Sequence, residues 1–269
     1  MNRLEALFGA LRARGERALV CYVVAGDPSL ECVPDLLRAV EDGGADVVEL
    51  GLPFSDPVAD GPSIQAAAQR ALERGASVAG ALKQLHRARE RVALPVVLMT
   101  YLNPVLRYGA ERFARDATAA GADGVIVTDL PPDEAAAWKA AARAAGLCTV
   151  FLVAPTSTQP RLELVARLAS GFVYCVSRTG VTGAREEVPA DLPDTVSRVR
   201  AVTSTPVCVG FGISTRDQVR AVTAIADGAV VGSALVDRVA ASRPRPGWLS
   251  EVRDFVADLK EGARVTRNR

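Results

Sequence analysis

The stretch Gly43-Gly44-Ala45-Asp46-Val47-Val48-Glu49-Leu50 joins the end of one helical segment to the start of a short apolar strand. Glycine ends helices readily because it adopts the left-handed cap conformation at little cost. The run at 47–50 is rich in valine and too short for a helix, which favours a strand. A similar order recurs at Gly121-Ala122-Asp123-Gly124-Val125, so the chain repeats a unit in which a helix stops and a strand begins.

Eight short apolar runs lie along the chain, and each is continuous rather than alternating in hydrophobicity. Such runs are typical of parallel strands that are covered on both faces. The runs are residues 18–24, 47–50, 95–99, 124–127, 149–153, 172–176, 206–209 and 228–231. Segments with helical periodicity separate them at residues 30–42, 64–74, 78–91, 110–120, 133–145, 159–169, 192–202 and 215–225.

Eight strand–helix units with short connections predict an α/β fold of the (β/α)8 TIM barrel type. Leu4, Leu7, Phe8 and Leu11 follow helical spacing before the first strand, so we expect an extra N-terminal helix. We interpret residues 1–269 as a single barrel domain. The alternative is a doubly wound open sheet, but only Gly26-Asp27-Pro28 follows the first strand, where that fold would carry a glycine-rich dinucleotide motif.

Composition excludes several classes of function. The 32 basic and 31 acidic residues nearly cancel, which argues against a nucleic-acid partner or an acidic membrane surface. No apolar run approaches the roughly 20 residues that a membrane span requires. The five cysteines lack metal-ligand spacing and indicate reduced thiols in a cytoplasmic protein. The only histidine, His86, lies in a polar helical stretch, which disfavours a histidine metal site or catalytic triad.

Two carboxylates stand where a barrel enzyme places its active site, at the carboxyl ends of the strands. Glu49 ends the second run, and burial there would raise its pKa toward neutrality. Asp60 precedes Gly61-Pro62 in the following loop. Each has a structural alternative: Glu49 as an acid bonded to nearby backbone, and Asp60 as a helix cap. Asp56 fits turn stabilisation or a partner contact better than catalysis, and Asp129 could orient a neighbour or close a turn.

Glycine-rich turns after the seventh and eighth strands indicate a phosphate site. Gly210-Phe211-Gly212 and Gly232-Ser233 would expose backbone N–H groups, and Ser233 would open a short helix at 234–236. Barrel enzymes commonly bind phosphate at these two loops, although the glycines alone could simply form tight turns. Residues 177–189 are long, glycine-containing and without apolar periodicity, which suits a closing lid or a disordered loop.

The blocks Glu49–Gln65 (ELGLPFSDPVADGPSIQ), 98–104 (LMTYLNP), 177–184 (SRTGVTGA) and 210–214 (GFGIS) resemble the tryptophan synthase alpha chain family, the indole-3-glycerol-phosphate lyases. The resemblance covers residues 4–259. It implies cleavage of indole-3-glycerol phosphate to indole and glyceraldehyde 3-phosphate, without a metal or organic cofactor. It also implies a tryptophan synthase beta chain as partner, in an alpha–beta heterotetramer, and no nucleic-acid or membrane partner.

By the same resemblance, Glu49 would protonate indole C3 and Asp60 would hold the indole N–H. The other residues implied to contact the substrate include Tyr22, which would face it from the first strand, and Tyr101 and Tyr174. Tyr174, at the end of the sixth strand, and Tyr101 would line the indole pocket or support the catalytic groups. Thr182 and Gly183 would belong to the closing loop, and Phe211, Gly212, Gly232 and Ser233 to the phosphate end. Tyr22 is the aromatic residue of the first strand that usually faces the substrate in this family, and phenylalanine is also familiar at this position. Three alternatives stay open at this point: a stand-alone lyase of secondary metabolism, a non-catalytic barrel that only activates a beta chain, and another phosphate-binding barrel enzyme.

Overall fold

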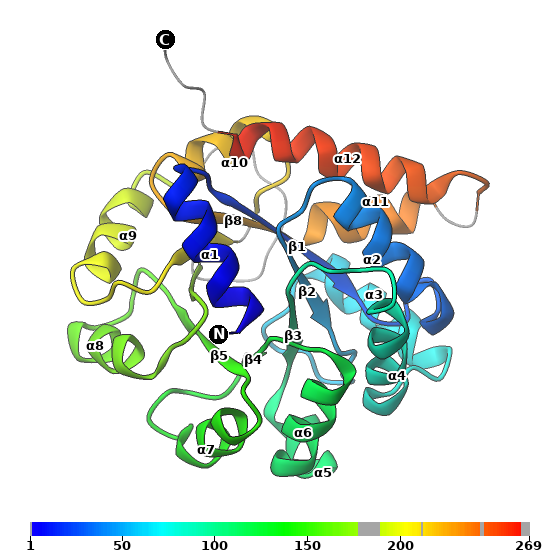
Figure 1. Ribbon diagram of the computed structural model, residues 1–269, viewed down its shortest axis with the longest axis horizontal. Helices are drawn as coiled ribbons and strands as arrows, with labels where there is room; N and C mark the ends of the chain where they lie inside the picture. Colours follow the sequence, from blue (N-terminus) through cyan, green and yellow to red (C-terminus); the bar gives the residue numbers. More distant parts are fainter. Residues whose placement is uncertain (1, 177–188, 211, 243–244, 265–269) are drawn as a thin grey trace.

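The computed structural model describes residues 2–176, 189–210, 212–242 and 245–264, and these form a closed barrel of eight parallel strands with helices around it (Figure 1). Each strand pairs with its neighbour in sequence, and β8 pairs back with β1. The strands are β1 Ala18–Val24, β2 Val47–Gly51, β3 Val96–Thr100, β4 Gly124–Val127, β5 Cys148–Val153, β6 Val173–Val176, β7 Val207–Gly210 and β8 Gly228–Val231. The predicted TIM barrel is therefore confirmed.

The helices mostly follow the segments expected from periodicity. They are α1 Arg3–Arg14, the 3-10 turn η1 Leu30–Cys32, α2 Val33–Asp42, α3 Pro62–Glu73, α4 Val78–Ala88, α5 Leu102–Tyr108, α6 Ala110–Ala120, α7 Ala136–Ala144, α8 Gln159–Leu168, α9 Leu192–Arg200, α10 Arg216–Thr223, α11 Ser233–Ser242 and α12 Trp248–Ala263. Most expected boundaries are within three residues of those observed. The separate helix α5 and the 3-10 start of the 30–42 segment were not expected.

The expected N-terminal helix is present as α1, and it lies across one end of the barrel (Figure 1). Leu4, Phe8 and Leu11 on α1 belong to the same buried cluster as the side chains inside the barrel. Phe8 stacks against Phe172, with ring centroids 5.8 Å apart, and Phe172 in turn lies 6.4 Å from the Tyr174 ring. Leu4 packs near the first residues of β4 and β5, so α1 covers the barrel end opposite the carboxyl ends of the strands.

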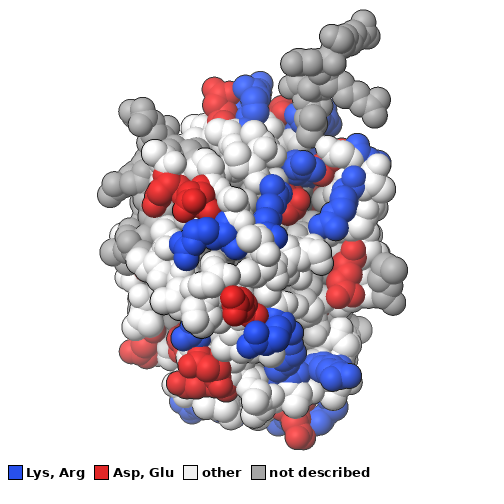
Figure 2. Space-filling model, turned by 90° about the vertical axis from the view of Figure 1, so that its left-hand side faces the viewer, with Lys and Arg blue, Asp and Glu red and all other residues white. Residues whose placement is uncertain are grey.

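Surface charge follows the balanced composition. On the face shown in Figure 2, basic and acidic side chains are interspersed rather than gathered by sign. His86 is exposed on α4, and all five cysteines are free thiols. Within the described ranges, no helix is long and apolar enough to cross a membrane, and no cluster of three or more His, Cys, Asp or Glu residues is placed to hold a metal ion.

Candidate active site

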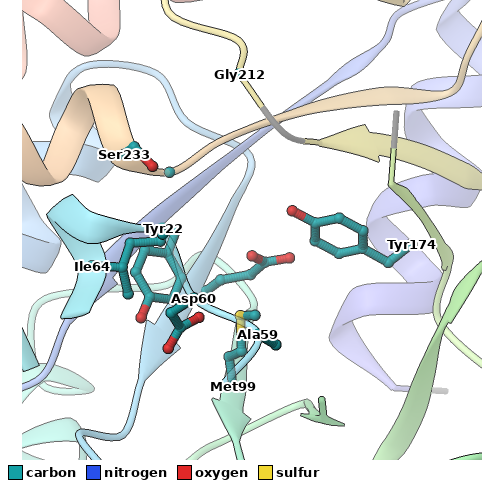
Figure 3. Close-up of a pocket in the computed structure, with 11 residues that line it drawn as sticks. Tyr22, Ala59, Asp60, Ile64, Met99, Tyr174, Gly212 and Ser233 are labelled. Atoms are coloured by element: carbon teal, nitrogen blue, oxygen red, sulfur yellow. The ribbon is translucent and has the colours of Figure 1, made fainter. Parts of the chain in front are cut away.

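A cavity with about 430 Å³ of empty space, part of it open to solvent, lies at the carboxyl ends of the strands (Figure 3). The side chains of β1, β2, β3 and β6 form its floor and walls, and the β2–α3 loop and the start of α11 form its rim. The lining residues are Tyr22, Glu49, Ala59, Asp60, Gly61, Ile64, Met99, Tyr174, Gly212, Gly232 and Ser233. None of these residues is basic, so the charge that the described residues bring to the cavity comes from the two carboxyl groups.

Glu49 lies inside the barrel near the end of β2, with only 1% of its surface exposed. Its Oε1 atom has no hydrogen-bond partner among the described residues, so no hydrogen bond there compensates the burial of a charge at that atom. Burial accordingly raises the pKa of Glu49 from its usual 4.5 to about 8. At neutral pH the side chain is therefore a carboxylic acid that faces the cavity with a proton to donate.

Asp60 follows β2 by nine residues, and the cavity-facing loop holds it through its backbone. Its N–H donates to the Pro57 carbonyl at 3.0 Å, and its own carbonyl accepts from Gln65 Nε2 at 2.8 Å. Burial raises the pKa of its carboxyl from 3.8 to about 6, against the opposing effect of a hydrogen bond with Tyr101. Asp60 is therefore mostly ionised at neutral pH, while Glu49 is not.

The helix-capping alternative for Asp60 is wrong. Helix α3 begins at Pro62, its N-cap residue is Gly61, and no side chain caps it. Proline at the first helical position needs no N–H partner there, which explains why this helix starts without a capping side chain. The Asp60 carboxyl group is thus left facing the cavity, where it is 8% exposed.

Tyr101 supports the loop rather than lining the cavity. Its hydroxyl accepts the Ala59 N–H at 3.1 Å and also hydrogen-bonds with Asp60. Its ring packs on Phe54, with centroids 5.3 Å apart. Of the two roles considered for this tyrosine, pocket wall and support for a catalytic group, the geometry favours the second. It also links the outer rim at Phe54 to the Asp60 carboxylate.

Tyr22 and Tyr174 enter the cavity from different sides of the barrel. Tyr22 on β1 is paired in register with Glu49 on β2, so both side chains point inward. Tyr174 was expected at the end of the sixth strand, but it is the second residue of β6 and stands deeper in the barrel. Its hydroxyl comes so close to Gly210 on β7 that a Cβ on Gly210 would stand 2.2 Å away.

Gly212, Gly232 and Ser233, expected at the phosphate end, line the same cavity as the two carboxyl groups. In Figure 3, Gly212 and Ser233 lie on the other side of the cavity from Asp60. Gly212 has φ +79°, a conformation that side-chain-bearing residues rarely adopt. The Gly232 carbonyl accepts the first helical hydrogen bonds of α11, from the N–H groups of Leu235 and Val236. The helix expected at 234–236 is longer than predicted and runs to Ser242, so a full helix points its N-terminus at the cavity.

Several site predictions lie outside the described residues, namely Thr182, Gly183, Phe211 and nearly all of the 177–189 loop. Conversely, sequence reasoning missed Ile64 and Met99, which add apolar wall to the cavity. The sequence did carry a signal for Met99, because this residue ends the expected strand at 95–99, where barrel enzymes place their active sites. In the structure Met99 pairs with Gly51, two residues beyond Glu49 on β2, and therefore points inward as Glu49 does. Asp129 lies off the cavity, and its Oδ1 accepts the Leu102 N–H at 2.7 Å.

Comparison with known proteins gives a consistent result. The family model described as tryptophan synthase alpha chain matches residues 8–264. A tryptophan synthase alpha chain from Geobacter sulfurreducens is 49% identical over 264 residues, which is 97% of this chain and 98% of that protein. Among solved structures, Mycobacterium tuberculosis tryptophan synthase is 40% identical with a TM-score of 0.90, covering 98% of this chain and 99% of the other. The tryptophan synthase subunit alpha of Legionella pneumophila is 34% identical with a TM-score of 0.88, and 98% of each chain is covered.

Proposed function

The chain belongs to the tryptophan synthase alpha chain family, and on that premise we propose how Glu49 and Asp60 carry out its reaction. The protein is a carbon–carbon lyase of tryptophan biosynthesis that cleaves indole-3-glycerol phosphate to indole and glyceraldehyde 3-phosphate. The observation that carries the assignment of roles is the pair of unlike carboxyl groups in one cavity, with pKa values of about 8 and about 6. Environments that separate two pKa values in this way assign one group as the acid and the other as the anion.

Glu49 begins the reaction as a general acid. Its proton passes to C3 of the indole ring, and the ring electrons that form the new C–H bond leave a positive charge on the indole nitrogen. The Asp60 carboxylate accepts the indole N–H and stabilises that charge in a site that is largely closed to water. Protonation thus turns the ring into an electron sink adjacent to the bond that has to break.

Glu49 then completes the reaction as a general base. The carboxylate left by the first step accepts the proton of the glycerol hydroxyl on the carbon attached to C3. As this carbon becomes the aldehyde carbonyl, the electron pair of the carbon–carbon bond returns to the ring and neutralises the nitrogen. Indole and glyceraldehyde 3-phosphate are released, Glu49 regains its proton, and the atoms balance without water or a cofactor.

The remaining cavity residues are proposed to bind the two ends of the substrate. Tyr22, Ile64, Met99 and Tyr174 form apolar surface for the indole ring. The backbone N–H groups at Gly212, Gly232 and Ser233 would bind the phosphate, aided by the dipole of α11. Thr182, Gly183 and Phe211 keep their proposed roles in loop closure and phosphate binding by resemblance alone.

We further propose a tryptophan synthase beta chain as partner, in an alpha–beta heterotetramer. The rim beside Asp60 offers apolar surface for it, because Val58 is 78% exposed and Phe54 is half-buried. A partner pressing on Phe54 would act through the Tyr101 ring on the Ala59–Asp60 backbone. Binding energy could then favour the competent arrangement of Asp60. A single-domain organisation over residues 1–269 and a cytoplasmic location remain predictions.

The experiment is an assay of indole release from indole-3-glycerol phosphate by the purified chain, with and without a tryptophan synthase beta chain. We expect slow release by the chain alone and an increase of at least about tenfold with the partner, which requires only about 1.4 kcal/mol of differential binding. Fast release that ignores the beta chain would contradict the partner proposal and select a stand-alone lyase. No release under either condition would contradict the proposed roles of Glu49 and Asp60.

A further inference from the structure

Gly51 ends β2 two residues after Glu49, and the position of the Tyr22 side chain explains why glycine is needed there. The Gly51 backbone lies outside the left-handed region, so the main-chain conformation does not require glycine. A Cβ at this position would stand 2.1 Å from Tyr22 Oη, 2.6 Å from Cζ and 2.8 Å from Cε2. These are the three nearest atoms, and all belong to Tyr22. Because separations below 3.0 Å are not tolerated, any larger residue at 51 would displace the tyrosine ring.

The position of the Tyr22 ring matters because the ring is a wall of the cavity. Tyr22 pairs in register with Glu49, is 6% exposed and lies between Ile64 and Asp60 (Figure 3). The ring is anchored at one end by β1 and reaches at the other end to the backbone of β2. Burial, and then the nearby carboxyl groups of Asp60 and Glu49, raise the pKa of the Tyr22 phenol well above its usual value, so the phenol stays neutral.

We propose that Gly51 is a positioning residue for the lyase reaction, which it serves by seating the Tyr22 hydroxyl against the β2 backbone. Close packing of the Tyr22 hydroxyl at Gly51 fixes the plane of the Tyr22 ring. The ring then forms the indole-binding wall next to Asp60. This inference rests on the proposed function, since it takes the indole ring to be the group that packs on Tyr22. Gly51 would thus affect substrate binding through Tyr22 on the neighbouring strand β1, without contacting the substrate itself.

A displaced Tyr22 ring and a misplaced Glu49 carboxyl group would change different kinetic parameters. The indole ring contacts the wall both in the bound substrate and in the transition state, so a displaced wall should raise KM more than it lowers kcat. A shift of β2 that misplaced the Glu49 carboxyl group would instead lower kcat, because proton transfer occurs only in the transition state. The steady-state kinetics of a Gly51 variant therefore distinguish the two explanations.

The test combines Gly51→Ala with a graded series at Tyr22, assayed for indole release with the full chain. Tyr22→Phe removes the atom at 2.1 Å, and Tyr22→Leu removes all three crowded atoms. In the wild-type background, Gly51→Ala should raise KM at least about tenfold, because a displaced wall loses contact with the indole ring in the bound substrate as well as in the transition state. In the Tyr22→Phe background the increase should be smaller. In the Tyr22→Leu background it should be less than about threefold, because the two sites are then no longer coupled.

Two glycine substitutions serve as matched controls. A Cβ on Gly9 in α1 would meet nothing within 4 Å, so Gly9→Ala should leave KM unchanged. A Cβ on Gly210 would stand 2.2 Å from the hydroxyl of Tyr174, so Gly210→Ala introduces a similar clash at a different wall. Its effect should persist in the Tyr22→Leu background, which would show that the relief at Gly51 is specific to Tyr22.

Each result of this test either supports the role of Gly51 or contradicts it. Unchanged KM in Gly51→Ala, a loss confined to kcat, or an equal loss in the wild-type and Tyr22→Leu backgrounds would each overturn the proposal. If Gly51→Ala fails to fold, the Gly51→Ala/Tyr22→Leu double variant should fold, and its failure would also overturn the proposal. An inactive wild-type chain would instead contradict the proposed function, so the two failures are distinguishable.

Discussion

Replacing Glu49 with glutamine should change the pH dependence of stability by an amount that follows from burial of the carboxyl group. In the unfolded chain this group titrates near 4.5, and in the folded protein near 8. Between these pH values the folded protein retains a proton that the unfolded chain has released, so the free energy of unfolding falls as pH rises. At about 1.4 kcal/mol per pKa unit, the full loss amounts to roughly 5 kcal/mol and is complete slightly above pH 8.

Urea unfolding of the wild type and of Glu49→Gln at pH 5, 6.5, 8 and 9 would measure this effect. The glutamine does not titrate, whereas Asp60 and all other groups titrate in both proteins and largely cancel in the difference. The stability of the variant relative to the wild type should therefore rise by several kcal/mol between pH 5 and pH 9. A difference that stays constant across this range would refute the argument that Glu49 is buried as a neutral acid.

Three further predictions concern the other groups in the cavity. The pH profile of kcat/KM should fall below about pH 6, as Asp60 gains a proton, and above about pH 8, as Glu49 loses one; a profile flat from pH 5 to 9 would contradict this. Asp60→Asn should lower kcat/KM at least about tenfold through the lost charge while leaving the melting temperature nearly unchanged, since Gly61 is the N-cap of α3; a parallel drop in melting temperature would point to a structural role. Ser233→Asp should weaken inhibition by glycerol phosphate at least about tenfold, because a fixed anion would stand at the phosphate position; unchanged inhibition would move that site elsewhere.

The barrel was predictable because its strands are short, continuous apolar runs, a pattern that depends on burial of both faces. Helix α5 was missed because its start is stabilised from a distance. Pro104 lies in its first turn, where proline is tolerated, and the N–H of Leu102 donates to Asp129, 27 residues further along the chain. Local sequence does not reveal a capping group that the fold supplies from the turn after the next strand.

The position and burial of Glu49 were predictable from its place at a strand end, but the surroundings of Asp60, nine residues beyond that strand, were not. The sequence left Asp60 equally open to capping a helix, and only the position of Gly61 as N-cap excludes that. Contacts between neighbouring strands leave one oxygen of Glu49 without a hydrogen-bond partner among the described residues and pack the Tyr22 hydroxyl against Gly51. Such contacts are set by barrel register, which a single strand does not specify.

In the proposed mechanism, Glu49 supplies the proton that initiates cleavage of the carbon–carbon bond. The most direct measurement is kcat for indole release by Glu49→Gln, together with the affinity of the variant for glycerol phosphate. Glutamine preserves the size of the side chain and removes the transferable proton, so kcat should fall by about 10²–10⁴-fold while ligand affinity stays within a few-fold. A variant that keeps more than about a tenth of the wild-type kcat, far above what loss of acid–base catalysis allows, would contradict this assignment.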